Sequence, residues 1–284
     1  MISKLFSVGD RVKPGRYYKH SQFSRVVNYT DGDLLVALVN ADVGAAPNNI
    51  VVSADRFLES SESLIVSEDK LAFDHEGFEL ELIPKYDSRF FCINEKAKTL
   101  DSVCEDIEEL IFHYSSPLSL AFLLDPEREV NFRTNFEKQL VSKLKASWDL
   151  FLRGKINEAV VTAKGTGLGL TPSGDDFLSG ILSGLRIGQL YYQKSLNKFC
   201  DEIYQEAIGT NIFSNTFLFY AKNGCFYESV KLMLQHLFVG STISPELVEK
   251  VFSRGETSGA DYIVGLWLGA ARLCVTGEND ARNV

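Results

Sequence analysis

The chain has 284 residues, 45% of them hydrophobic and 24% charged, which is long enough for two modest domains with a buried core. A formal net charge of −9 argues against nucleic acid as a partner, but one local pocket can still bind small anions. Five cysteines without CxxC spacing indicate reduced thiols of a cytoplasmic protein. No signal peptide or membrane-length apolar run is recognisable, so we expect no membrane association.

The first third of the chain has the pattern of β-strands. Two apolar runs, 26–29 and 34–39, flank Asp31-Gly32, which predicts a hairpin because glycine accepts a positive φ angle. The strict alternation of apolar and polar residues in one further run predicts a strand with one buried face. The additional strands are expected at 49–53, 63–67 and, for the alternating run, 78–82.

After about residue 95 the apolar spacing becomes helical. Apolar residues recur every three or four positions over 136–151 and again over 226–237, as in helices that pack one face on a core. We therefore predict an α+β chain, with a β-rich, barrel- or sandwich-like domain over 1–95. This domain is expected to pack on an α-helical domain over 96–284.

The segment 164–176, with the sequence KGTGLGLTPSGDD, concentrates residues of special chemistry. Its alternating glycines predict an exposed loop over a pocket at Gly165–Gly169, with backbone amides available to a ligand. Ser173 stands where the N-cap of the following helix belongs. Unpaired amides and the positive end of the helix dipole make a helix start suitable for phosphate or carboxylate. The hydroxyls of Thr171 and Ser173 add further donors, so the segment predicts a site for a small anion.

None of the better-known glycine loops matches this segment. It lacks the Gly-Lys-Ser/Thr end of a P-loop and the glycine spacing of a Rossmann fingerprint. Ser173 also lacks the flanking glycines of a nucleophile elbow, which argues against an acyl-enzyme nucleophile. The four histidines are isolated, so neither a zinc site nor a Ser-His-Asp triad is expected. The candidates for acid–base catalysis are therefore Asp175, Asp176 and Asp261.

The segment 258–269 repeats the pattern of 173–184 at a constant offset of 85 residues, from Ser173 to Ser258. Both copies read Ser-Gly-x-Asp, with glycines four and eight positions after the aspartate, so the aspartate and both glycines share one helical face. One interpretation is a pair of capped helices, since such a cap stabilises a helix by ~1 kcal/mol without any ligand. The other is a shared site. For it, we predict that the two helices are related by pseudo-symmetry and direct their N-termini at one pocket.

Two aspartates at such a pocket, Asp176 and Asp261, would repel an anion unless they cap their helices or hold a divalent cation. Mg²⁺ is the cation expected, because it prefers carboxylate and phosphate oxygens. Between the two copies, Thr210 and Ser214 mark another polar helix start, which is either a cap or a surface that faces the substrate. The predicted substrate-binding residues are Gly167, Gly169, Thr171, Ser173, Gly174, Thr210, Ser214, Thr257, Ser258 and Gly259.

The run Gly167-Leu168-Gly169-Leu170-Thr171-Pro172-Ser173-Gly174-Asp175-Asp176 resembles the hallmark of a bacterial family of AllH/YlbF-type proteins. That hallmark is similar to Gly-Leu-Gly-x-Gly-Leu-Thr-Pro-Ser-Gly-Asp-Asp, and this chain lacks the usual Pro-Gly before the leucine. Segments 210–214 and 255–261 also look like blocks of the family. Its best-understood members are subunits of oxamate carbamoyltransferase in purine and allantoin catabolism, and an older label for the family is carboxylase.

The resemblance implies a subunit that transfers a carbamoyl group between oxalurate and phosphate. Its ligands would be small anions, namely oxalurate, oxamate, phosphate and carbamoyl phosphate, and its partners other enzyme subunits or further copies of itself. Two alternatives stay open. One is a non-catalytic assembly or ligand-sensing subunit, and the other is a free-standing carboxylase or lyase.

Overall fold

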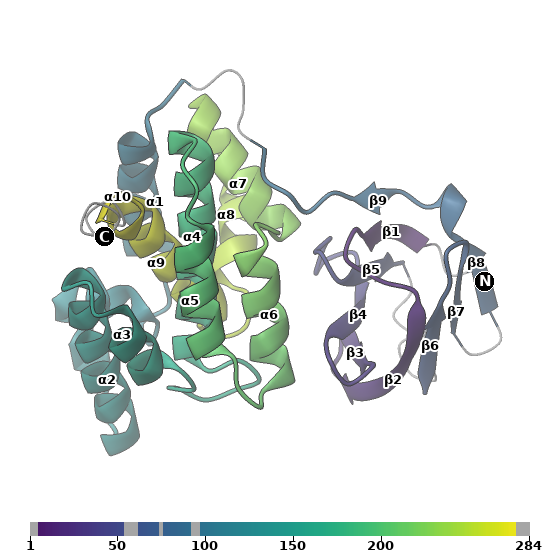
Figure 1. The fold of residues 1–284 in the computed structure, drawn as a ribbon, viewed down its shortest axis with the longest axis horizontal. Coiled ribbons are helices and arrows are strands. Elements are labelled where there is room, and N and C mark those ends of the chain that lie inside the picture. The colour runs from purple at the N-terminus through teal and green to yellow at the C-terminus, as the bar shows by residue number, and fades with distance from the viewer. Residues whose placement is uncertain (1–4, 54–61, 74–75, 92–96, 277–284) are drawn as a thin grey trace. The chain divides into compact units, whose positions relative to one another are not determined.

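The structure is a computed structural model that describes residues 5–53, 62–73, 76–91 and 97–276 (Figure 1). The chain forms two compact units, one of Met1–Arg89 with Phe226–Glu228 and one of Phe90–Cys225 with Ser229–Val284. Strands make up the first unit and helices the second, so the predicted α+β class is confirmed.

The first unit is a curled sheet of nine strands in the order β8-β7-β6-β2-β3-β4-β5-β1-β9 (Figure 1). Neighbouring strands are antiparallel except for β4 with β5 and β1 with β9, which are parallel. The strands are β1 Leu5–Gly9, β2 Gly15–Gln22, β3 Val26–Thr30, β4 Leu35–Asn40, β5 Asn49–Val52, β6 Ser63–Val66, β7 Lys70–Phe73, β8 Glu76–Glu79 and β9 Lys85–Tyr86.

The predicted hairpin is confirmed. Strands β3 and β4 pair antiparallel with Val27 opposite Leu38, and Gly32 in their turn has a φ angle of 107°. Both of these apolar side chains are buried in the core of the unit. The predicted strand at 78–82 is wrong in its second half. There the Leu80 amide donates to the Asp69 carbonyl, and Leu80–Leu82 form a 3₁₀ turn without buried residues.

The second unit is built around α4, whose first 13 residues are all buried. The helices predicted over 136–151 and 226–237 are confirmed as α2 and α7, although α7 begins only at Glu228. The helices are α1 Leu100–Tyr114, α2 Asn135–Leu152, α3 Ile156–Ala163, α4 Ser173–Tyr192, α5 Asn197–Ala207, α6 Ile212–Lys222, α7 Glu228–Val239, α8 Pro245–Phe252, α9 Ser258–Leu268 and α10 Cys274–Thr276. Short 3₁₀ turns η3 (Leu120–Leu123) and η4 (Pro126–Asn131) follow α1, and a π-helical turn η5 (Gly269–Leu273) follows α9.

Helices α4 and α9 lie against each other in parallel, through glycines. A Cβ atom on Gly180 would lie 2.0 Å from the Tyr262 carbonyl oxygen, and one on Gly265 would lie 2.0 Å from the Phe177 carbonyl oxygen. These contacts are reciprocal, because each residue is replaced by its equivalent at the offset of 85. The second pair of glycines, Gly184 and Gly269, makes the same kind of contact, with the carbonyl oxygens of Leu266 and Ile181. The predicted local pseudo-symmetry is therefore present.

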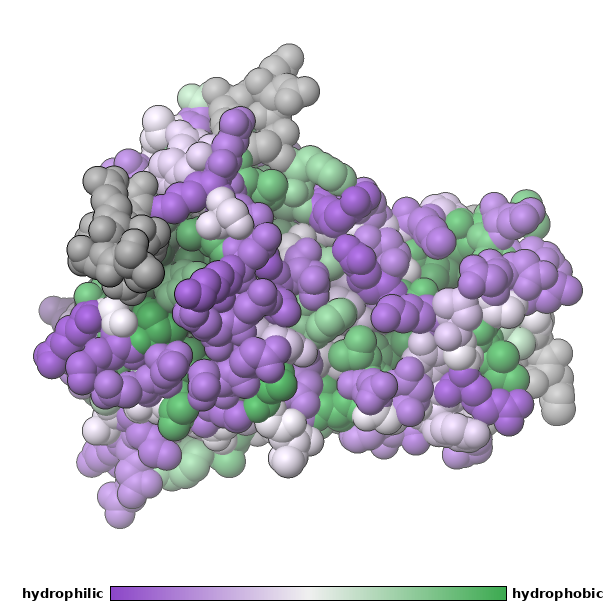
Figure 2. Space-filling model, viewed as in Figure 1, coloured by the Kyte–Doolittle hydropathy of each residue, from purple (hydrophilic) through white to green (hydrophobic). Residues whose placement is uncertain are grey.

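Four cysteines, Cys104, Cys200, Cys225 and Cys274, are buried free thiols, as expected, whereas Cys92 lies outside the described residues. Hydrophilic side chains cover much of the face shown in Figure 2, with hydrophobic residues between them. Within the described ranges, no helix is both long and apolar enough to cross a membrane.

Candidate functional site

The N-terminal ends of α4 and α9 lie next to each other. The hydroxyl of Thr171, just before α4, lies 3.3 Å from the hydroxyl of Ser258, the first residue of α9. Asp176 and Asp261 occupy the same position in the two helices, and the charge of Asp261 acts on Asp176. The two helix starts thus meet as predicted, whereas the shared pocket stays a prediction. We call the group formed by Thr171, Ser173, Asp176, Thr257, Ser258 and Asp261 the hydroxyl–carboxyl cluster.

Asp176 is 8% exposed and is held by hydroxyl groups. Its Oδ2 atom accepts a hydrogen bond from the Thr171 hydroxyl at 3.0 Å. Burial raises the pKa of this carboxyl well above its usual range, and the neighbouring Asp261 carboxylate raises it further. Hydrogen bonding by Ser258 and Thr171, together with the charge of Arg254, lowers the pKa but does not offset the burial.

Asp261 is completely buried and its two oxygens differ in environment. Oδ1 accepts the backbone N–H of Leu120 at 2.7 Å, whereas buried Oδ2 has no hydrogen-bond partner among the described residues. Burial raises the pKa of Asp261 to about 7, against the opposing effects of Leu120 and of the Ser173 and Thr257 hydroxyls. These hydroxyls are near enough to affect the pKa, but neither completes a hydrogen bond to Oδ2.

The prediction that Ser173 caps α4 is wrong, and the capping interpretation of the repeat fails for Ser258 as well. The N-cap residues are Pro172 and Thr257, neither of which makes a side-chain capping bond, and the serines are the first residues inside the helices. The reason is that the two starts face each other. The Ser258 hydroxyl lowers the pKa of Asp176, and the Ser173 hydroxyl lowers that of Asp261. Each serine hydroxyl therefore lies near the carboxyl group of the other helix.

Gly174 and Gly259 dock each helix start against the end of the preceding helix. Added Cβ atoms would lie 1.9 Å from the Ala163 carbonyl oxygen and 2.1 Å from that of Val251. The amide of Gly174 donates to the Thr166 carbonyl at 2.8 Å, and that of Gly259 donates to the Arg254 carbonyl at 2.9 Å. These amides already have partners, so the substrate contacts predicted for the two glycines rest on the sequence pattern alone.

Asp175 has other hydrogen-bond partners than Asp176, and it connects two segments of the helical unit. Its Oδ1 accepts the Gly165 amide at 2.7 Å and its Oδ2 accepts the Ser214 hydroxyl at 2.6 Å. The carboxylate therefore ties the start of the glycine-rich loop to α6. The catalytic role predicted for Asp175 stays a prediction, and its bonds favour a structural one.

The glycine-rich loop between α3 and α4 is exposed at Gly165 and at 168–170, as predicted. Gly165, Gly167 and Gly169 have φ angles of 66°, 125° and 98°, which side chains other than hydrogen rarely permit. The loop is anchored at its far end, where the Asn211 side chain donates to the Leu170 carbonyl at 2.8 Å.

The start of α6 differs from the prediction at Thr210. Its N-cap is Asn211, whose Oδ1 accepts the amides of Phe213 and Ser214, and Thr210 is an exposed residue before it. The sequence offers two adjacent capping residues, and asparagine is the stronger cap. The hydroxyl of Ser214 is turned to Asp175, so neither residue belongs to the hydroxyl–carboxyl cluster.

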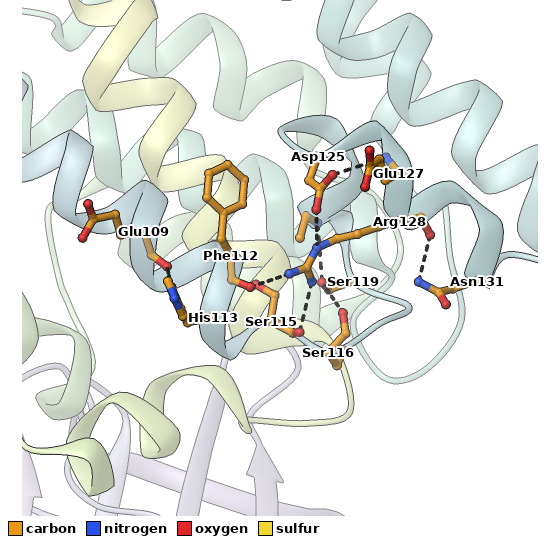
Figure 3. A network of polar contacts seen from close by, with 11 residues as sticks. Glu109, Phe112, His113, Ser115, Ser116, Ser119, Asp125, Glu127, Arg128 and Asn131 are labelled. Atoms are coloured by element: carbon orange, nitrogen blue, oxygen red, sulfur yellow. Dashed lines mark hydrogen bonds and ion pairs between the residues drawn. The ribbon is translucent and has the colours of Figure 1, made fainter.

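Sequence reasoning missed Leu120, whose backbone amide donates to Asp261, a residue 141 positions away. The turn that carries Leu120 is fixed by a network around Arg128 (Figure 3). There the guanidinium donates to the carbonyls of Phe112 and Ser115 and to the Asp125 carboxylate. The Ser119 hydroxyl adds a bond to the Ser116 carbonyl at 2.7 Å. Asp125 before a proline is a recognisable cap, but no local signal connects this turn with Asp261.

Arg254 and Lys164 are the cations that the sequence places near the two helix starts. Arg254 acts on Asp176 and lies over the Phe217 ring at 5.6 Å, while Lys164 donates to the Glu206 and Ile208 carbonyls at the end of α5. A cavity of about 500 Å³ lies apart from the cluster, against α3 and α5. In the described part of the chain, no three His, Cys, Asp or Glu side chains are grouped to hold a metal ion. The cavity is lined by Asn157, Lys198, Asp201, Glu202, Gln205 and Glu206.

Comparison with known proteins singles out the same region. Residues 164–270 match the family model described as "Oxamate carbamoyltransferase subunit AllH". The matched range begins at the glycine-rich loop and includes every member of the hydroxyl–carboxyl cluster. No solved structure matches the chain. Residues 164–270, which carry the glycine-rich loop and both helix starts, are thus similar to the AllH family.

Proposed function

We propose that this chain is a subunit of an oxamate carbamoyltransferase-type enzyme of ureide (allantoin and purine) catabolism, and that the hydroxyl–carboxyl cluster forms part of its substrate site. One observation carries the proposal. Cluster residues from Thr171 to Asp261 are far apart in the sequence, fall within the range matched by the family model, and meet at one point.

The chemistry of the cluster suits a carbamoyl group. A carbamoyl carbonyl accepts hydrogen bonds, and hydroxyl groups can donate them. Thr171, Thr257 and Ser258 are partly exposed, and the hydroxyls of Thr171 and Ser258 lie 3.3 Å apart, so we expect this pair to meet the substrate. When phosphate attacks the carbamoyl carbon, negative charge develops on this carbonyl oxygen, and donors already in place stabilise it.

The remaining members position and balance this pair of hydroxyls. Asp176 lies 3.0 Å from the Thr171 hydroxyl and also acts on Ser258, so it fixes the orientation of both hydroxyls. Because burial raises the pKa of Asp176 and favours its protonated form, this carboxyl can donate to one hydroxyl and leave that hydroxyl's own proton for the carbamoyl oxygen. Arg254, in the segment before α9, supplies positive charge for an oxalurate carboxylate or a phosphate. Of the three aspartates predicted to be catalytic, Asp176 is therefore the best placed.

The test is carbamoyl phosphate formation from oxalurate and phosphate, with the partner subunits present. We expect Ser258→Ala and Asp176→Asn to assemble normally and to lower kcat by about 10²-fold, the usual cost of losing a transition-state donor. Asp149→Asn, the same chemical change at an exposed position of α2, should leave kcat unchanged. Normal turnover by the assembled Asp176→Asn enzyme would show that the site is assigned wrongly.

A ligand-sensing or assembly subunit without chemistry of its own is the second candidate. It is favoured by exposed apolar side chains on and beside the glycine-rich loop, where Leu168 is 74%, Val161 60% and Leu170 46% exposed. Exposed apolar groups next to a polar cluster are common where another polypeptide binds. Calorimetry with oxamate, oxalurate and phosphate separates the two. Tight binding by the isolated chain, with no activity in any mixture of subunits, supports sensing.

A further inference from the structure

We propose that Asp176 and Asp261 bind one hard divalent cation, Mg²⁺ by its chemistry, between the starts of α4 and α9. The proposal concerns the chain by itself and goes beyond the transferase function, since a metal site at this point can be tested whether or not the chain takes part in carbamoyl transfer.

One buried carboxylate oxygen of Asp261 is unpaired among the described residues. A buried carboxylate oxygen without a hydrogen bond is costly, and proteins usually satisfy such atoms or use them for binding. Here Oδ1 is held by the Leu120 amide at 2.7 Å, and Oδ2, on a residue with 0% exposure, has no partner in the described part of the chain. A carboxylate with one oxygen fixed by a backbone amide and the other directed to a cation is a common arrangement in metal sites.

Oxygen-bearing side chains surround this carboxyl group. Asp176 is near enough for its charge to couple with Asp261, and the Ser173 and Thr257 hydroxyls also lie close to Asp261. All of these groups offer oxygen, which suits Mg²⁺ and Mn²⁺ and disfavours zinc, whose sites prefer nitrogen and sulfur. Mg²⁺ commonly uses one or two carboxylates and fills its other positions with water or substrate phosphate. A site with two carboxylates therefore matches its habits.

The charge of the site also favours a cation. Burial and mutual repulsion disfavour ionisation of both carboxyls, so the ionised pair needs positive charge close by. Each helix N-terminus offsets roughly half a unit of negative charge, and the charge of Arg254 acts on Asp176. A divalent cation would add positive charge at the carboxylates themselves, in place of the protons that burial favours. The partly exposed Thr171, Thr257 and Ser258 mark the side from which it enters.

The experiment uses the purified full chain, stripped of metal with a chelator and titrated with Mn²⁺ while free Mn²⁺ is followed by electron paramagnetic resonance. We expect one saturable site per chain, competition by Mg²⁺, and a higher Tm in the presence of either ion. Asp261→Asn and Asp176→Asn should weaken Mn²⁺ binding by at least about tenfold. Asp149→Asn should bind as the unchanged protein does.

Folding of the variants can be judged separately. The Asp261→Asn side chain keeps a carbonyl oxygen that can accept the Leu120 amide, so the metal-free variant should melt no lower than the unchanged chain. Absence of saturable Mn²⁺ binding by the unchanged chain at millimolar metal would overturn the proposal. Undiminished binding by folded Asp261→Asn would overturn it as well, because the ion would then lie elsewhere.

Discussion

Replacing Gly180 by alanine probes the contact on which the candidate site depends. The added Cβ would lie 2.0 Å from the Tyr262 carbonyl oxygen and 2.7 Å from the Leu266 amide nitrogen, whereas ordinary contacts begin near 3.4 Å. Both neighbours are backbone atoms of α9, so no side-chain rotation relieves the overlap. The two helices have to move apart by roughly 1 Å or more, which is a large shift in a close-packed interior.

The cost can be estimated from this geometry. Overpacking a core usually costs about 1–3 kcal/mol, and separating α4 from α9 also loses contacts along both helices. Alanine has the better helix propensity by about 1 kcal/mol, which offsets only part of the loss. We therefore expect Gly180→Ala to lower the free energy of unfolding by about 3 kcal/mol, a large share of the ~5–15 kcal/mol of a typical protein.

Urea denaturation followed by circular dichroism measures this difference. Gly209→Ala is the matched control in the same unit, because its Cβ would meet only the flexible end of Lys164, at 3.2 Å. Gly265→Ala should cost as much as Gly180→Ala, and the double variant should cost less than both together, since the first change already separates the helices. A urea midpoint for Gly180→Ala equal to that of the unchanged chain would refute this reasoning.

Three further predictions concern single side chains. In metal-free buffer the pKa of Asp261 is about 7 in the folded chain against 3.8, so its contribution to the free energy of unfolding is complete below about pH 4 and is lost as the pH rises to 7. Asp261→Asn should remove this pH dependence, which amounts to at most about 4 kcal/mol, in urea titrations across that range. Asp175→Asn should cost about 1–3 kcal/mol and speed hydrogen exchange at Gly165, with Ser214→Ala reproducing only part of the loss; unchanged exchange would contradict the bracing role. Lys164→Met should lower the Tm by a few degrees, about 1 kcal/mol, because α5 loses a cation at its carboxyl end, and an unaltered melting curve would speak against this cap.

Features encoded locally were predictable from the sequence. The β3–β4 hairpin follows from Asp31-Gly32 between two apolar runs, since the turn itself demands a residue that accepts a positive φ angle. The pairing of α4 with α9 was also predictable, because glycines at equivalent positions of two helices leave matching grooves. Gly180 and Gly265 fill these positions. In both cases the residue type states what the backbone must do.

Features that depend on a distant neighbour were not predictable. Ser173 has the sequence context of a cap, yet it is the first residue inside α4. Its hydroxyl lies near Asp261 because the start of α9 is beside it. Leu120 carries no sign of its bond to Asp261, since any residue except proline supplies an amide. Each case is decided by a tertiary contact that competes with a local preference.

The reciprocal glycine contacts also restrict how the site can move. Each glycine of one helix receives a carbonyl oxygen of the other, so sliding α4 along α9 by one residue would push a side chain into backbone. The glycine contacts therefore fix the position of α4 along α9. The spacing between Asp176 and Asp261 is set by these contacts, one and two turns further along the helices. A cation bound there as proposed would have to fit a separation that the helix contact sets, and any adjustment would have to come from the surrounding side chains or from the loop that begins at Gly165.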